Sequence, residues 1–218
     1  MKKSFILVNF FVCLTISYDA IFQDKEYEPG YYVTQNGDTI KGYFWTKDQN
    51  KLSNLKMKKE VNETISTDLS FDTCQSLLIK NRFYVSWYGK RCMAYVSKFD
   101  FDLKYIDSFL TQTIPLRLLY QGSILSLFLY RSDVKDHFFV KKGNSIAELI
   151  ISYRYRTDLE KFTESHTRNP ATYYVVPAYQ NQLSAYLGDK LTKKLKDNIE
   201  SCDYDEVALI RLFKRLNK

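Results

Sequence analysis

The sequence predicts an α+β fold that is mainly β: an antiparallel meander, a curled sheet or a small barrel, with a C-terminal pair of short amphipathic helices. Two patterns predict it. β-rich runs separated by turn residues follow one another through residues 31–155, and apolar residues recur at helical spacing after Pro177. The chain of 218 residues has 18 Tyr and 15 Phe beside 7 Gly and 4 Pro. This composition suits one domain with an aromatic core.

The N-terminus has the pattern of an export signal. Two lysines precede an apolar run that ends at Ile16, and the small residues that follow place cleavage after Ser17 or after Ala20. The run is too short to span a bilayer comfortably as a permanent helix. The order of positive and apolar residues favours a signal peptide over a buried N-terminal strand or helix.

The signal divides the chain into three expected units. These are a signal peptide at 1–20, a β-rich domain at 21–178 and a helical tail at 179–218 that packs on the β domain. No later run approaches the ~20 apolar residues of a transmembrane helix. We therefore expect an exported protein, periplasmic, outer-membrane-associated or extracellular, with no transmembrane span in the mature chain.

The strongest hairpin signal lies just after the leader. Two β-rich runs, 31–34 and 39–45, flank the turn 35–38, which contains Asn36 and Gly37. Asn-Gly between such runs predicts a type I′ turn, in which both central residues need a positive φ.

Further strands are expected along the next hundred residues. A polar, Lys-rich stretch at 47–70 carries weak strand signals near 55–61. Beyond it, the expected pairs are 75–80 with 82–88 across Asn81, a strand at 91–97 after a turn at Gly89, 116–120 with 123–130 across Gln121-Gly122, and 137–140 with 146–155 around 142–144. The residues 146–151 fit a helical turn equally well.

The helical tail is expected after Pro177. Residues 182–187 are apolar at helical spacing, and Gly188 then interrupts the pattern before Leu191, Leu195 and Ile199 recur every four residues. Asp203 is expected to cap the last helix, with Glu206 three residues on. The apolar face of that helix consists of Leu209, Leu212, Phe213 and Leu216.

The distribution of charge narrows the range of partners. The formal charge of +7 includes two lysines of the leader, and the remaining Lys and Arg are spread without a block of five. This pattern is compatible with a weak anionic partner and does not call for nucleic acid, so an envelope protein or a glycan is the expected partner class.

Three cysteines, Cys74, Cys92 and Cys202, remain after cleavage of the signal peptide. They form either one disulfide, Cys74–Cys92, or three buried reduced thiols.

Three stretches together resemble a group of exported proteins common in Bacteroidota. The first is PGYYVTQNGDTIKGY at 29–43, which is similar to a recurring G-D-T-I-x-G hairpin after the signal peptide. The second is LYQGSILSLFLY at 119–130, and the third is the tail with Cys202, Tyr204 and Asn217, where Leu216 replaces an expected Tyr. The group has no assigned activity. The resemblance therefore implies an exported protein and adds no catalytic residue.

No motif of catalysis, metal binding or phosphate binding occurs in the sequence. The two histidines, His137 and His166, belong to no His-Glu-x-x-His pattern, and Cys-x-x-Cys and Gly-x-Ser-x-Gly are absent. We interpret His137 as an exposed strand end and His166 as part of a polar loop. No catalytic residue, metal or cofactor is assigned.

The aromatic residues are the best candidates for ligand binding. They could form a sugar- or peptide-binding surface or pack in the core. The set is Tyr31, Tyr32, Tyr43, Phe44, Trp45, Tyr84, Trp87 and Tyr88. Within it we assign ligand binding to Tyr43, Trp45 and Trp87, because strand alternation puts Tyr43 and Trp45 on one face and Phe44 on the other.

The sequence thus favours an exported envelope or secreted protein that is a non-enzymatic structural or binding module. The alternative is a hydrolase-type enzyme with a site near His137, His166 or Cys202.

Overall fold

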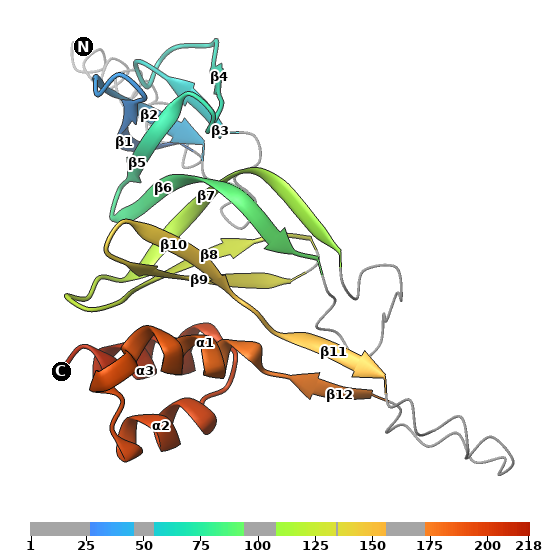
Figure 1. Ribbon diagram of the computed structural model, residues 1–218. Coiled ribbons are helices and arrows are strands. Elements are labelled where there is room, and N and C mark those ends of the chain that lie inside the picture. The colour runs from blue at the N-terminus through green and yellow to red at the C-terminus, as the bar shows by residue number, and fades with distance from the viewer. Residues whose placement is uncertain (1–26, 46–54, 94–107, 134, 156–172) are drawn as a thin grey trace, which may run out of the picture.

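The computed structural model describes residues 27–45, 55–93, 108–133, 135–155 and 173–218. This part of the chain forms a ten-stranded antiparallel sheet curled into a half-barrel, a separate two-stranded pair and three short α-helices near the C-terminus (Figure 1). The predicted fold class, mainly β with an antiparallel curled sheet and short C-terminal helices, is confirmed.

The large sheet consists of two meanders joined by the pairing of β1 with β5. Its strand order is β10-β9-β8-β7-β6-β5-β1-β2-β3-β4. The strands are β1 (Tyr27–Thr34), β2 (Thr39–Trp45), β3 (Leu55–Lys58), β4 (Thr67–Leu69), β5 (Cys74–Ile79), β6 (Arg82–Cys92), β7 (Phe109–Tyr120), β8 (Ser126–Arg131), β9 (Asp136–Lys142) and β10 (Ser145–Leu149). The second sheet pairs β11 (Ser152–Tyr155) with β12 (Tyr173–Val176). The helices are α1 (Ala178–Leu187), α2 (Lys193–Glu200) and α3 (Glu206–Leu216), with a 3₁₀ turn, η3 (Gly188–Lys190), after α1.

The β1–β2 hairpin forms where expected, but its turn differs from type I′. Gly37 has a φ of 91°, whereas Asn36 is not in the positive-φ region. The Thr34 amide donates to the Asp38 carbonyl at 2.9 Å, and Val33 pairs with Thr39. This longer loop reverses the chain with one left-handed residue, which a type I′ turn of two residues cannot do.

Gly89 lies inside a strand instead of forming the expected turn. β6 runs through it, and Gly89 pairs with Gln112 of β7. A Cβ atom at Gly89 would lie 2.3 Å from the ring of Trp87. Glycine is therefore required there because the indole occupies the space above the strand.

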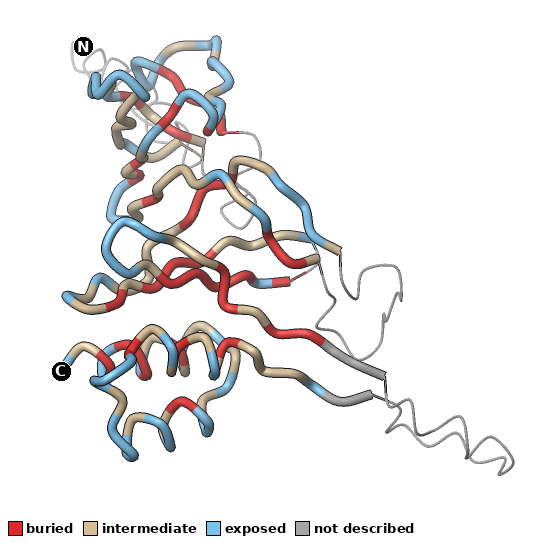
Figure 2. The backbone as a smooth tube through the Cα atoms, in the orientation of Figure 1, coloured by how far each residue is buried: buried red, intermediate tan, exposed pale blue. Residues whose placement is uncertain are grey.

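The helical tail covers one face of β7–β10 (Figure 1). Strand alternation puts Leu127, Phe138 and Leu149 on this face, where they pack with α1 and α3. The burial pattern in Figure 2 shows the buried segments of the strands and helices facing one another. The predicted apolar face of α3 is buried as expected: Leu209, Leu212, Phe213 and Leu216.

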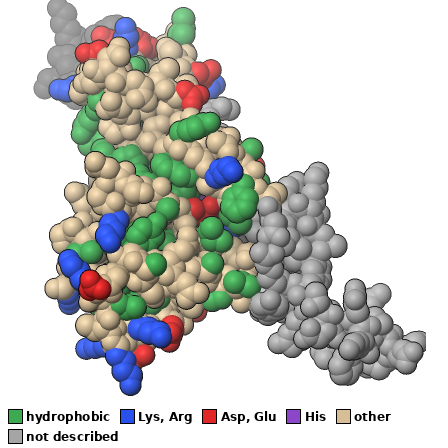
Figure 3. Space-filling view, viewed as in Figure 1, with side chains coloured by type: hydrophobic (Ala, Val, Ile, Leu, Met, Phe, Trp, Pro, Cys, Tyr) green, Lys and Arg blue, Asp and Glu red, His purple; other side chains and the backbone are tan. Residues whose placement is uncertain are grey.

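The opposite face of β6–β10 forms the inside of the half-barrel. Its core consists of Ile114, Leu116, Phe128 and Phe139, with Val85 and Trp87 packed against them. Figure 3 shows hydrophobic side chains gathered across the middle of the view, over β6 and β10, where the helices do not lie. A third cluster under β1–β5 includes Phe44, Leu55, Phe71 and Leu77.

The cap of α3 is Asp205, not Asp203. The Asp205 side chain accepts a hydrogen bond from the Ala208 amide at 2.9 Å. Glu206, the first helical residue, forms ion pairs with Arg117 of β7 at 2.7 Å and Arg131 of β8 at 2.9 Å. The helix begins at Glu206 because Asp205, directly before it, caps the free amide of Ala208, and the two ion pairs of Glu206 hold this end of the helix on the sheet.

Asn217 joins the end of the chain to the β7–β8 turn. Its Oδ1 accepts from the amides of Ile124 at 2.8 Å and Leu125 at 3.0 Å. Its Nδ2 donates to the carbonyls of Leu125 at 2.9 Å and Phe213 at 2.8 Å. One side chain thus satisfies four backbone groups that are partly buried.

We expect Asn217→Ala to lower the free energy of unfolding by about 1–3 kcal/mol, because buried backbone donors and acceptors lose their partner. Urea denaturation measures the change. Lys218→Ala, at the exposed neighbouring residue, is the matched control and should leave the midpoint in place. Equal midpoints for the two variants would contradict the role of Asn217.

Candidate functional site

Two adjoining cavities flank the turn between β4 and β5, and together we call them the Asp72 groove. Their volumes are about 450 Å³ and about 290 Å³, and both are lined by Phe71, Asp72 and Thr113. The larger cavity is further lined by Asp68, Leu69, Ser70, Gln112, Ile114, Pro115 and Tyr130, and the smaller by Gln35, Gln75, Ser86 and Tyr88. The groove therefore combines apolar side chains with carboxylates, amides and hydroxyls.

Side-chain to backbone hydrogen bonds hold the wall of the groove. Ser86 of β6 donates to the Phe71 carbonyl at 2.6 Å, which seats the turn on the sheet. Gln35 of the β1–β2 turn donates to the carbonyls of Asp72 and Cys74, at 3.4 and 3.3 Å. Because amide nitrogens are used in these bonds, the amide and carboxylate oxygens remain as acceptors at the groove.

Tyr88 presents the most exposed aromatic ring beside the groove. Its exposed fraction is 72%. It pairs with Thr113 across β6 and β7, and within the described residues neither side chain has a hydrogen-bond partner. The Asp72 carboxylate beside them accepts one hydrogen bond, from the Ser70 hydroxyl at 3.3 Å. An exposed ring next to such hydroxyls and carboxylates is a surface to which a polar ligand with an apolar face can bind.

Two of the three aromatic residues assigned to ligand binding, Trp45 and Trp87, pack against other side chains of the protein. The Trp45 ring stacks on Tyr27 with ring centroids 6.4 Å apart, and the Lys56 ammonium lies 5.3 Å from the Trp45 centroid. Trp87 packs edge-to-face on Phe139, with centroids 4.8 Å apart. The rings of Trp45 and Trp87 thus already have partners in the chain.

The fold does not gather the three predicted residues into one site. Tyr43 and Trp45 lie on β2, and three strand spacings, about 14 Å along the sheet, separate β2 from the strand of Trp87. The helical tail lies at the other end of the sheet from β2 (Figure 1). Aromatic character alone placed Tyr88 in the predicted set. Its ring is exposed because Tyr88 follows Trp87 directly in β6, and neighbouring residues of a strand point to opposite faces of the sheet.

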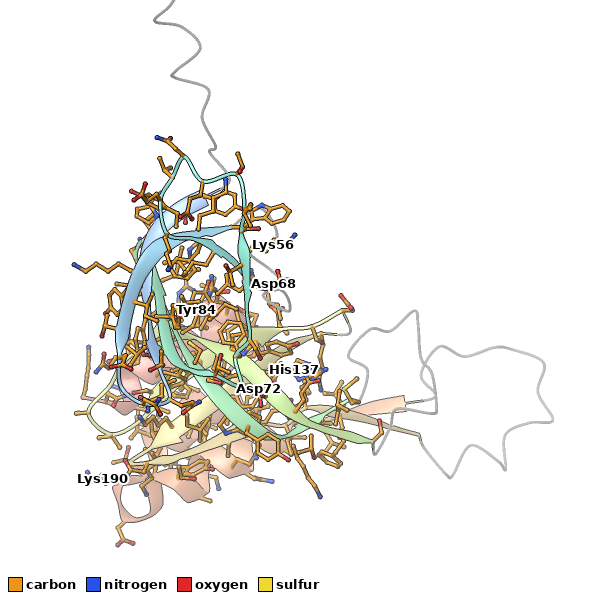
Figure 4. All side chains as sticks on the ribbon, turned by 90° about the horizontal axis from the view of Figure 1, so that it is seen from above. Lys56, Asp68, Asp72, Tyr84, His137 and Lys190 are labelled. Carbon is orange, nitrogen blue, oxygen red and sulfur yellow. The ribbon has the colours of Figure 1, made fainter. Side chains whose placement is uncertain are left out.

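A buried polar cluster, which we call the His137 cluster, lies inside the half-barrel. It consists of Arg91, Ser132, Lys135, His137 and Glu148. His137 is fully buried and Glu148 is 5% exposed, so the interpretation of His137 as an exposed strand end was wrong. Figure 4 shows His137 among the strands, whereas Lys190 lies at the periphery.

Hydrogen bonds fix the imidazole at both nitrogens. His137 Nδ1 donates to Glu148 Oε1 at 2.7 Å, because a carboxylate only accepts. The other nitrogen, Nε2, then accepts from Arg91 Nη1 at 3.1 Å and lies 3.0 Å from Ser132 Oγ. The second oxygen of Glu148 accepts from the Cys92 amide at the end of β6.

Burial favours the neutral form of His137. Burial lowers the pKa of His137 below its ordinary value; the hydrogen bond to Glu148 opposes this, and the positive charges of Lys135 and Arg91 lower the pKa further. Burial also lowers the pKa of Lys135. Within the described residues, Arg91 Nε and Lys135 Nζ have no hydrogen-bond partner.

Ser132, His137 and Glu148 are hydrogen-bonded in the arrangement of a catalytic triad, with a nucleophile, a base and an orienting acid. Two contacts weaken this interpretation. Arg91 shares the Nε2 atom that would take the serine proton, and the Ser132 hydroxyl also bonds the backbone of Lys135, at 3.1 and 3.2 Å. We therefore interpret the cluster as structural: its hydrogen bonds link β6, β9 and β10.

The three described cysteines are free thiols. The β5–β6 register puts Cys74 level with Trp87, so Cys92 lies five residues further along, about 17 Å away, and the fold does not bring this predicted pair together. Burial raises the pKa of Cys74 and of Cys202 to about 11. His166 lies outside the described residues.

No described group of three or more His, Cys, Asp or Glu side chains is placed to hold a metal ion. None of the described helices has both the length and the apolar character needed to cross a membrane.

Comparison with protein-family models, curated proteins and solved structures finds no match to this chain.

We expect the folded state to lose stability as the pH falls from 7.5 to 5.5. The unfolded chain takes up a proton at His137 near pH 6.5. The folded chain resists protonation because its His137 pKa is lowered, so the stabilisation is present above pH 6.5 and is lost below it. Urea midpoints measured across this range test the prediction.

In His137→Gln the slope of stability against pH should flatten. His166→Gln, which removes the other histidine, should keep it. An unchanged slope in His137→Gln would show that other groups cause the pH dependence.

Proposed function

We propose that the protein is an exported envelope or secreted binding module that holds a neutral carbohydrate in the Asp72 groove. The exposed ring of Tyr88, beside a groove lined by carboxylates, amides and hydroxyls, is the observation that carries the proposal. The leader-like N-terminus supports an exported location.

The composition of the groove matches the surface of a sugar. A pyranose ring has an apolar face of C–H groups and a rim of hydroxyls. Tyr88 offers an aromatic face to the former, while Asp72, Gln75 and Thr113 offer hydrogen-bonding groups to the latter. Two adjoining cavities of about 450 and 290 Å³ suit a short oligosaccharide better than a single sugar ring.

The charge of the groove favours a neutral ligand. Asp68 and Asp72 both line it, and no lysine or arginine is among its lining residues. Figure 4 shows Asp68 close to Lys56, its partner across β3 and β4, so one carboxylate has a cation nearby. Asp72 has no such neighbour among the lining residues and would repel uronic or sulfated sugars.

A second candidate function is a serine hydrolase with Ser132 as nucleophile, His137 as base and Glu148 as orienting acid. The distances of 3.0 and 2.7 Å favour it. The proposal of a binding module is preferred because Arg91 competes with Ser132 for the same imidazole nitrogen.

We expect Tyr88→Ala to weaken the binding of a neutral oligosaccharide about tenfold, because the stacking surface is lost. Calorimetry with malto-, cello-, xylo- and manno-oligosaccharides measures affinity, and an oligouronate serves as the charge control. Tyr88→Phe should bind like the native chain, since the ring remains.

Val207→Ala is the matched control. It removes an apolar side chain that is 56% exposed on α3, away from the groove lining, and should leave the affinity for the oligosaccharide unchanged. The proposal fails if no neutral oligosaccharide binds or if Tyr88→Ala binds as tightly as the native protein.

We expect a fluorophosphonate probe to leave Ser132 of the folded protein unlabelled. The reason is that Arg91 and the Lys135 backbone occupy the atoms needed for proton transfer and attack. Mass spectrometry locates any label. Labelling at Ser132 that disappears in His137→Gln would favour the hydrolase instead.

A further inference from the structure

A separate cavity of about 310 Å³ lies at the turn end of the half-barrel, and we call it the Lys141 cavity. It shares no lining residue with the Asp72 groove. Its lining residues come from β6, β7, β8, β9 and the turns that join them: Phe83, Val85, Leu118, Gln121, Gly122, Ser123, Ile124, Ser126, Phe128, Lys141 and Gly143.

One wall of the cavity, on β6, β7 and β8, is apolar because of strand alternation, whereas the turn residues Gln121 and Ser123 and the Ser126 side chain make the rest polar. Leu118 pairs directly with Phe128, and Val85 lies on the same face of β6. This is the face opposite the helical tail, so no helix fills the space in front of these side chains. Val85 and Leu118 are half-buried, which leaves part of their apolar surface to a ligand.

Lys141 is the one charged side chain among the lining residues. It pairs with Ser126 of β8 and with Ile146 of β10, so it lies on the inner face of the half-barrel. It is half-buried, and it forms no ion pair or hydrogen bond through its side chain within the described residues. A single cation beside an apolar wall is complementary to an amphipathic ligand that carries one negative charge.

The turn that closes the cavity is held rigid by the C-terminus. Asn217 binds the amides of Ile124 and Leu125 and the carbonyl of Leu125. A Cβ atom at Gly122 would lie 2.2 Å from Asn217 Oδ1, so the turn and the tail are in close contact. A wall fixed in this way loses little conformational freedom when a ligand binds.

We propose that the Lys141 cavity binds an amphipathic carboxylate, with the carboxylate on the Lys141 ammonium and the hydrocarbon against Val85, Leu118 and Phe128. The volume lies at the lower end of the range for small-molecule sites, roughly 300–1,000 Å³. It therefore suits a single chain of medium length. The site is independent of the proposed carbohydrate groove, and either one can hold without the other.

Calorimetric titration of the folded chain with decanoate, decanol and decylamine tests the proposal, because the three probes share a chain and differ in charge. We expect decanoate to bind most tightly with one site per chain, decanol more weakly, and decylamine weakest. Absence of saturable decanoate binding, or equal affinity for decanoate and decylamine, would overturn the proposal.

Variants locate the site. Lys141→Gln should weaken decanoate binding roughly tenfold and leave the affinity for decanol unchanged. Lys141→Arg keeps the positive charge and should bind decanoate like the native chain. Val85→Phe should weaken both probes by filling the cavity, and a thermal melt shows whether it folds. Lys190→Gln, at an exposed lysine that does not line the cavity, is the control. If Lys141→Gln and Lys190→Gln both bind decanoate like the native chain, Lys141 does not hold the carboxylate.

Discussion

The curl of the sheet depends on the carboxylate of Glu148. In a flat sheet, β10 and β6 would lie four strand spacings apart, about 19 Å. Glu148 of β10 nevertheless accepts a hydrogen bond from the Cys92 amide of β6 and another from His137 of β9. The carboxylate can bridge these strands only when the sheet curls over its own inner face. The space between β6 and β9 that forms the Lys141 cavity is a consequence of that curl.

The cluster around this carboxylate specifies the fold more than it stabilises it. Burying Arg91, Lys135 and Glu148 carries a desolvation cost that the hydrogen bonds of the cluster offset incompletely, so a well-packed apolar core could be equally stable. Apolar side chains, however, have no preferred direction. Hydrogen bonds from Arg91 and to Glu148 fix the imidazole of His137 at both nitrogens, and this selects one register between β6, β9 and β10.

The sequence predicts local structure well and long-range contacts poorly. The Asn-Gly hairpin, the 75–88 pair and the apolar face of α3 are encoded within short segments, and each is present. Gly89 was misread because the ring that requires it belongs to Trp87, and a pattern does not show where a ring lies. The partners of His137 come from β6, the β8–β9 loop and β10, so no spacing in the sequence could have revealed them.

The candidate site shows the same limit at the scale of one residue. Trp87 and Tyr88 are neighbours with similar aromatic character, and composition gives no reason to separate them. Alternation directs Trp87 to the inner face, where it meets Phe139, and directs Tyr88 to the other face, where 72% of it is exposed. Which of the two points inward depends on the register of β6 with β7. That register also determines that Arg91, two residues further than Gly89, points inward to meet His137. The exposure of the proposed binding residue and the burial of the polar cluster are therefore two results of one strand register, and a one-residue shift of β6 would exchange them.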